Sequence, residues 1–157
     1  MASLILLLGE LRQDRRALTK HLAAAAAVEL GGADDADFAL FALSVHHAYT
    51  ALESIMERVH RQLLAEAPAG ADWHRRLLDD ARLDLPGLRP PLLSVETVRL
   101  AHELRGFRHV VRHAYEMEYD RARLLLVQHA GAALAEALAA DLDALEGWLG
   151  SLAEPVR

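Results

Sequence analysis

The side chains best suited to act on an anion lie within residues 104–119 of this 157-residue chain. These sixteen positions hold three arginines, two histidines and two tyrosines: Arg105, Arg108, Arg112, His109, His113, Tyr115 and Tyr119. No acidic residue occurs between Leu104 and Tyr115, although the formal net charge of the chain is −6. Such a cluster of cations indicates a binding partner that is either a carboxylate on a neighbouring element or a phosphate.

These residue types are the ones that cleave RNA without a metal ion. A guanidinium holds the phosphate and offsets the charge that develops on it. An imidazole exchanges protons near neutral pH, and the ribose 2′-hydroxyl serves as the nucleophile. The overall acidity of the chain argues against broad, non-specific nucleic-acid binding, but it leaves room for one local basic site.

On a helical wheel, this stretch divides into two faces. An apolar stripe is formed by Leu100, Leu104, Phe107, Val111 and Ala114, and another face by Arg105, Arg108, Arg112 and Tyr115, with His109 and His113 beside it. Arg108 and His113 are five positions apart, which separates them by about 140° on an ideal helix. They converge if the long arginine reaches over, if the helix loosens near Gly106 or past His113, or if a second subunit completes the site, and we favour the dimer. The simpler alternative is a polar face that is solvated or pairs with acids of a neighbouring helix.

The rest of the sequence predicts long helices, because leucine, alanine, glutamate and arginine dominate and no strand-like alternation appears. A first helix is expected over residues 4–30, ending at Gly31 and Gly32. A second is expected to begin among the acids of residues 34–37 and to end at residues 67–70. Its packing stripe is Phe41, Val45, Ala48, Leu52, Ile55, Val59 and Leu63.

Three more helices complete the prediction. A short one is expected over residues 72–83, anchored by Trp73 and Leu77, followed by a proline-rich loop over residues 85–91. Ser94 is predicted to cap the helix that carries the cationic stretch. A last helix is expected over residues 120–148, capped by Asp120. Four leucines are expected to face inward: Leu134, Leu138, Leu142 and Leu145. The residues expected to end it are Gly147, Gly150 and Pro155.

We therefore predict an all-α fold: an antiparallel up-and-down bundle of four long helices and one short one, forming a single domain over residues 1–157. The chain has no cysteine, so disulfides and thiolate sites are excluded, and a reducing cytoplasm fits. The apolar run of residues 4–8 is too short to span a membrane and lacks the basic start of a secretory signal. A soluble cytoplasmic protein is expected.

The spacing Arg108-x4-His113-x-Tyr115 resembles the R-x4-H-x-Y motif of HepT-like proteins, a branch of the HEPN superfamily. Residues 42–59, Trp73-His74 with Leu77-Leu78, and residues 103–115 also resemble that family, and the likeness extends over about residues 5–145. Two residues at a fixed gap recur by chance, but the motif together with these flanks is specific.

The resemblance implies a metal-independent, homodimeric ribonuclease toxin of a bacterial type VII-like toxin–antitoxin pair, with its HEPN-type cleft at the dimer interface. It implies Arg108 and His113 as catalytic residues, no cofactor and no metal, and an MNT-type nucleotidyltransferase antitoxin as partner. That antitoxin would silence the toxin by AMPylation of Tyr115. His109 fills the polar position after the arginine that the superfamily often keeps, whereas RNA-binding roles for Arg105 and Arg112 are inferred from charge.

Two other classes of protein remain open. Glu57 and His60 match half of a di-iron helical-bundle pattern, but no second such motif occurs. His46, Glu53 and His60 lie seven apart along one stripe, and His109 with His113 could hold one metal, but no third convergent ligand is evident. The other alternative is a non-catalytic helical module that binds a nucleotidyltransferase or a nucleotide. This module would share the fold and the motif, and only the intact pair of Arg108 and His113 favours the enzyme.

Overall fold

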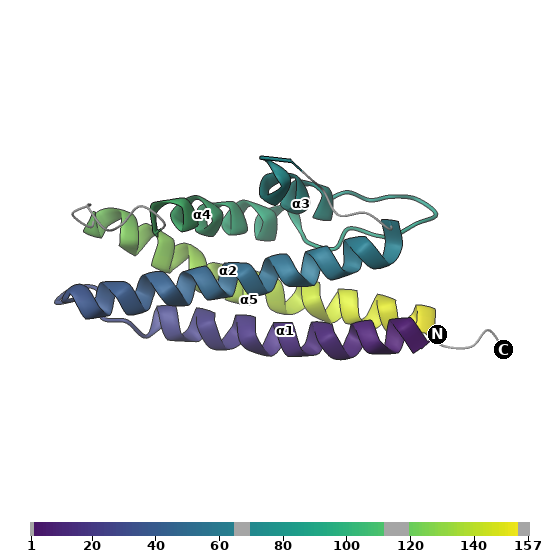
Figure 1. Ribbon diagram of the computed structural model, residues 1–157, viewed down its shortest axis with the longest axis horizontal. Helices are drawn as coiled ribbons and strands as arrows, with labels where there is room; N and C mark the ends of the chain where they lie inside the picture. Colours follow the sequence, from purple (N-terminus) through teal and green to yellow (C-terminus); the bar gives the residue numbers. More distant parts are fainter. Residues whose placement is uncertain (1, 65–69, 112–119, 154–157) are drawn as a thin grey trace.

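A computed structural model describes residues 2–64, 70–111 and 120–153, with the side chains of residues 109–111 left out. Within these ranges the chain forms five helices: α1 (Ala2–Ala26), α2 (Asp35–Leu64), α3 (Trp73–Ala81), α4 (Val95–Val111) and α5 (Arg121–Ala153). The four long helices run alternately up and down, and α3 lies against one side of them (Figure 1). The predicted all-α bundle of four long helices and one short one is confirmed.

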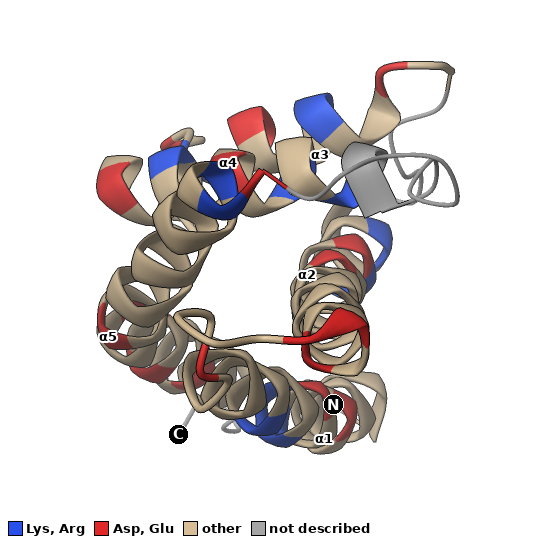
Figure 2. Cartoon of the chain, turned by 90° about the vertical axis from the view of Figure 1, so that its left-hand side faces the viewer, with Lys and Arg blue, Asp and Glu red and all other residues tan. Residues whose placement is uncertain are grey.

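Viewed end-on, α1, α2, α5 and α4 stand at the corners of a four-helix arrangement (Figure 2). α1 packs against α2 and α5, and α4 packs against the same two helices from the opposite side. α3 contacts α2 and α4, so it covers the groove between them. Buried apolar side chains from all five helices form one continuous core, because each long helix turns an apolar stripe inward.

The predicted packing stripes are largely confirmed. In α2, the stripe is buried from Phe41 to Val59, and Leu63 lies partly buried at its end. In α5, the four predicted leucines are at most 5% exposed. In α4, Leu100, Leu104 and Phe107 are buried, whereas Val111 and Ala114 lie outside the described side chains.

Side-chain caps begin three of the helices where the sequence predicts. Asp34 accepts hydrogen bonds from the backbone N–H groups of Ala36 and Asp37, at 2.9 and 3.0 Å. Ser94 Oγ accepts one from Thr97 N–H at 3.2 Å, and Asp120 accepts one from Ala122 N–H at 3.0 Å. These side chains satisfy donors that an isolated helix start leaves unpaired.

The predicted end of the first helix is wrong. α1 stops at Ala26, well before Gly31 and Gly32. The reason is tertiary: the side-chain amide of Gln128 in α5 donates to the carbonyls of Ala25 and Val28, at 3.0 and 2.9 Å. The chain therefore turns early, and the turn buries Val28 and Leu30.

The predicted end of the last helix is also wrong. α5 continues through Gly147 and Gly150 to Ala153. Leu149 is fully buried and Trp148 packs against the core, so burial of this turn outweighs the low helix propensity of the two glycines. α5 is also long and apolar enough to cross a membrane by length and composition alone, which is weak evidence because helices of soluble cores pass the same test.

The proline-rich loop is held by a buried arginine that the sequence did not single out. Arg89 is 4% exposed, and its guanidinium donates to the carbonyls of Asp80, Leu83 and Pro90 at 2.7 to 3.1 Å. Gly87 takes a φ of +82° in the tight turn, a conformation that favours glycine. Burial lowers the pKa of Arg89, but its carbonyl partners suit the charged form, and the loop thereby fixes the end of α3.

Replacing Gln128 by alanine should lower the free energy of unfolding by about 1 kcal/mol, because the carbonyls at the end of α1 lose their donor. Chemical denaturation followed by circular dichroism would measure the change. Gln13→Ala, at an exposed position of α1, is the matched control and should leave stability nearly unchanged. Equal effects of the two substitutions would contradict a capping role for Gln128.

Candidate functional site

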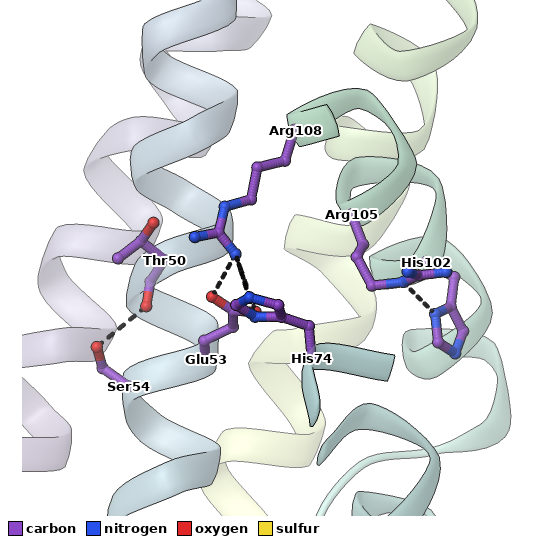
Figure 3. A network of polar contacts seen from close by, with 7 residues as sticks. All are labelled: Thr50, Glu53, Ser54, His74, His102, Arg105 and Arg108. Carbon is purple, nitrogen blue, oxygen red and sulfur yellow. Dashed lines mark hydrogen bonds and ion pairs between the residues drawn. The ribbon is translucent and has the colours of Figure 1, made fainter. Parts of the chain in front are cut away.

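Arg108 lies at the centre of a polar cluster formed by α2, α3 and α4. Its Nη1 donates to Glu53 of α2, at 3.0 Å from Oε2 and 3.3 Å from Oε1. His74, in the first turn of α3, contacts the same carboxylate through Nδ1 and lies 3.1 Å from Arg108 Nη1. Figure 3 shows the three side chains converging from three different helices. The cluster thus joins residues that are distant in the sequence.

The cluster is more buried at its carboxylate than at its imidazole. The side chains of Glu53, Arg108 and His74 are 6%, 16% and 27% exposed. A carboxylate buried to this extent requires compensation of its charge, and both Arg108 and His74 supply hydrogen-bond donors to it. The arrangement fixes the guanidinium in one place and leaves the imidazole at the surface of the cluster.

Tyr49 forms the floor beneath Arg108. Its ring is fully buried and its centroid is 5.8 Å from the guanidinium carbon, within the range of a cation–π contact. Burial, with the nearby negative charge of Glu53, raises the pKa of the Tyr49 phenol far above its ordinary value. Tyr49 therefore stays neutral and serves as packing for the cation.

The helices position this cluster through their buried faces. Tyr49 and Glu53 are four positions apart in α2, on the side that faces α3 and α4. In α4, burial of Leu104 and Phe107 turns Arg105 and Arg108 toward α3. The described part of α4 is continuous through Gly106, so the helix does not loosen there.

A pocket of about 370 Å³ opens beside the cluster. It is lined by the chain around the start of α3 and by two arginines of α4: Gly70, Ala71, Asp72, Trp73, His74, Arg75, Arg105 and Arg108. Arg75 is within 4 Å of Asp72 and Asp79, whereas Arg105 donates to His102 at 3.1 Å and forms no ion pair with a described carboxylate. Arg105 and Arg108 therefore form a positively charged side of the pocket, which could contact an anionic ligand.

The structure brings together only part of the predicted site. Arg105 and Arg108 line the same pocket, as their shared helix face predicts. His109 belongs to α4, but its side chain is outside the described residues, as are Arg112, His113 and Tyr115 altogether. Arg108 is not solvated: it pairs with an acid of a neighbouring helix, which was the simpler alternative for this face.

Sequence reasoning missed Glu53 and His74 as partners of Arg108. Glu53 has a detectable signal, because it stands between Leu52 and Ile55 of the predicted packing stripe, and a charge placed near such a stripe needs a partner. His74 belongs to the Trp73-His74 pair that resembles the family, but nothing in its surroundings in the sequence points to Arg108 as its partner. Only the packing of α3 on α2 and α4 reveals its role.

A metal site has no support among the described residues, which contain no group of three or more histidine and acidic side chains placed to hold an ion. Glu57 instead pairs with Arg61 one turn along α2. His109 and His113, the other metal candidates, fall outside the described side chains. The chemistry that the described part of the site offers is that of cations, an imidazole and a buried carboxylate.

Comparison with known proteins identifies the family. The model of a family described as HepT-like protein matches residues 40–149, which include most of α2, all of α3 and α4 and most of α5, and therefore every residue of the cluster and pocket. No curated protein and no solved structure matches the chain. The chain belongs to the HepT-like protein family, in agreement with the resemblance of its Arg108-x4-His113-x-Tyr115 motif to the HepT-like branch of the HEPN superfamily.

Proposed function

We propose that this protein is a metal-independent ribonuclease toxin of a bacterial toxin–antitoxin pair and acts in the cytoplasm as a single-domain protein. The observation that carries the proposal is the placement of Arg108 in a cation-lined pocket of a HepT-like chain. Arg108 would bind the scissile phosphate and His113 would exchange protons with the ribose or the leaving group. Arg105, His109 and Arg112 would support RNA binding.

The contacts of Arg108 are compatible with this role. Its hydrogen bonds to Glu53 use Nη1, and its Nε is buried without a hydrogen-bond partner among the described residues, so Nη2 is the nitrogen that would donate to a phosphate. The guanidinium is therefore held in position while part of its donor capacity remains. A positioned cation loses little conformational entropy when a phosphate binds, which is the basis of preorganised electrostatic catalysis.

We further propose that a homodimer forms the complete site. Because α4 is regular through Gly106, loosening there does not bring Arg108 and His113 together. The remaining ways are a long reach of the arginine, loosening past His113, which lies outside the described residues, and completion by a second subunit. A shared cleft would let the His113 of one subunit meet the Arg108 of the other. Cross-linked dimers mixed from Arg108→Ala and His113→Ala subunits would then regain one intact site.

The central test is RNA cleavage by the purified protein with EDTA present. We expect cleavage to persist in the chelator, because guanidinium and imidazole replace a metal in charge stabilisation and proton transfer. Expression without the antitoxin should stop bacterial growth. A protein that cleaves no RNA and arrests no growth would overturn the proposal.

We propose that an MNT-type nucleotidyltransferase antitoxin neutralises the toxin at Tyr115. The phenol oxygen would attack the α-phosphorus of ATP, pyrophosphate would leave, and the phenol proton would pass to solvent. The added phosphate would then occupy the arginine cluster that binds RNA.

Tyr115→Phe should prevent this neutralisation, because phenylalanine has no hydroxyl to accept AMP. After co-expression with the antitoxin, intact mass should show an AMP adduct on the wild type and none on the variant, and the variant should remain toxic. Tyr49→Phe is the control, since Tyr49 is fully buried and should leave the adduct in place. An adduct on Tyr115→Phe would refute the assignment.

A non-catalytic module is the second candidate, and one observation favours it. The pairing of Arg108 with the buried Glu53 could serve packing of α4 on α2 alone, with the pocket used only to bind a nucleotide or a nucleotidyltransferase. In that case RNA cleavage would be absent while complex formation with the antitoxin persisted. The two candidates are thus separated by the same cleavage assay.

A further inference from the structure

Cleavage of RNA through its own 2′-hydroxyl requires two proton transfers. One group must take the proton from the 2′-hydroxyl, and another must give a proton to the departing 5′ oxygen. His113 supplies one such group in the proposed function. The pocket beside Arg108 contains a second imidazole, that of His74.

His74 is oriented by a buried carboxylate. Its Nδ1 contacts Glu53, whose side chain is 6% exposed and accepts from Arg108 as well. A carboxylate that accepts from one ring nitrogen holds the proton on that nitrogen and leaves a lone pair on the other. With Nδ1–H directed at Glu53, Nε2 becomes the proton-accepting atom.

Arg108 does not block that atom. Its Nη1 lies 3.1 Å from His74 Nδ1 and 3.4 Å from Nε2. Similar distances to both ring nitrogens place the guanidinium nitrogen over the face of the imidazole, since an in-plane approach between the two would collide with the carbon that joins them. The lone pair of Nε2 lies in the ring plane and therefore points elsewhere.

His74 is also accessible to substrate. Its side chain is 27% exposed, and it lines the same pocket as Arg105 and Arg108. The ring of Trp73 packs against the imidazole of His74, with the two ring centroids 3.7 Å apart. A phosphate held by Arg108 would thus lie beside an imidazole whose orientation is already fixed by Glu53.

We propose that His74 is the general base of the RNA cleavage site and that Glu53 is its positioning residue; this inference rests on the proposed ribonuclease function. Nε2 takes the proton of the 2′-hydroxyl as the 2′ oxygen bonds to phosphorus, and the bond from phosphorus to the 5′ oxygen breaks. A proton from His113 completes the leaving 5′-hydroxyl. The products are a 2′,3′-cyclic phosphate and a 5′-hydroxyl end, and the histidines regain their starting states by exchange with water.

The charges that face His74 come from three helices. Glu53 of α2 is directly bonded, Arg108 of α4 covers the ring, Arg105 of α4 shares the pocket, and Asp72 and Arg75 flank it in the chain. Tyr49 lies below and is neutral. Because a general base acts only when deprotonated, cleavage that depends on this imidazole should increase with pH.

His74→Asn tests the assignment with little disturbance of the cluster. The asparagine amide can donate to Glu53 from nearly the position of Nδ1, but it has no atom that accepts a proton. We expect the cleavage rate to fall about 100-fold or more and the rising limb of the pH–rate profile to disappear. His129→Asn, at an exposed position of α5, is the matched control and should retain wild-type cleavage.

A substrate with sulfur in place of the 5′ bridging oxygen distinguishes a base from an acid. The thiolate leaves without protonation, so this RNA should rescue His113→Ala but leave His74→Asn slow. Rescue of His74→Asn would overturn its role as base, and wild-type cleavage of ordinary RNA by His74→Asn would exclude any proton transfer by it. If the wild type cleaves no RNA, the proposed function falls and this inference with it; loss of the His74 assignment alone leaves the ribonuclease intact.

Discussion

Arg108→Ala is expected to reduce RNA cleavage by about 10²–10³-fold, the loss that follows removal of one preorganised charge-stabilising group. The same substitution should relieve the proposed growth arrest when the protein is expressed alone. Arg99→Ala is the matched control, because Arg99 is on the same helix, is 59% exposed and pairs with the equally exposed Glu96 three positions away. Initial cleavage rates on a fluorogenic RNA would measure both variants.

Arg108→Ala also removes the partner of a buried carboxylate, so loss of activity must be separated from loss of fold. Arg108→Lys serves this purpose, because lysine keeps the positive charge but lacks the planar fork of a guanidinium. We expect the free energy of unfolding of this variant to be close to that of the wild type, and we expect it still to cleave RNA slowly. Wild-type cleavage by both variants would refute a catalytic role for Arg108.

Glu53→Ala should produce the largest loss of stability, about 3–5 kcal/mol in the free energy of unfolding, because it leaves the guanidinium of Arg108 buried without its counter-charge. Urea denaturation would measure the effect. Glu57→Ala is the matched control one turn along α2, where the carboxylate pairs with Arg61, whose side chain is 67% exposed. Removing that exposed pair should cost about 1 kcal/mol or less.

The double variant Glu53→Gln with Arg108→Met distinguishes the stability that comes from the two charges from the stability that comes from packing. Replacing both charges leaves no unpaired ion, so the double variant should be more stable than Glu53→Ala. A cost below about 1 kcal/mol for Glu53→Ala itself would contradict the buried ion pair. The combined series would show how much of the α2–α4 contact depends on charge and how much on packing.

The sequence predicts the helices well where local chemistry decides them. Asp34, Ser94 and Asp120 cap their helices because an oxygen-bearing side chain before an amphipathic run satisfies the first N–H groups wherever it occurs. The predicted ends of α1 and α5 were wrong because tertiary contacts decide where these helices end. Gln128 stops α1 early, and burial of Leu149 carries α5 past two glycines.

The candidate site likewise has a part that local sequence predicts and a part that tertiary packing decides. Placement of Arg105 and Arg108 on one face follows from helical periodicity alone, and the structure puts both at one pocket. Their neighbours depend on which helices pack together, and no periodicity links Glu53 and His74 to Arg108 across 55 and 34 positions. The roles of His113 and Tyr115 remain predictions from the family motif.

The Gln128 contact with the end of α1 has a consequence for biosynthesis. The last turn of α1 is closed by a side chain that is translated about a hundred residues later, as the separation of 103 positions between Gln128 and Ala25 shows. α1 and α2 can pair early, but the corner that joins them reaches its final form only when α5 emerges. In a nascent chain this corner therefore stays unfinished, with the carbonyls at the end of α1 lacking their donor, until Gln128 has been made.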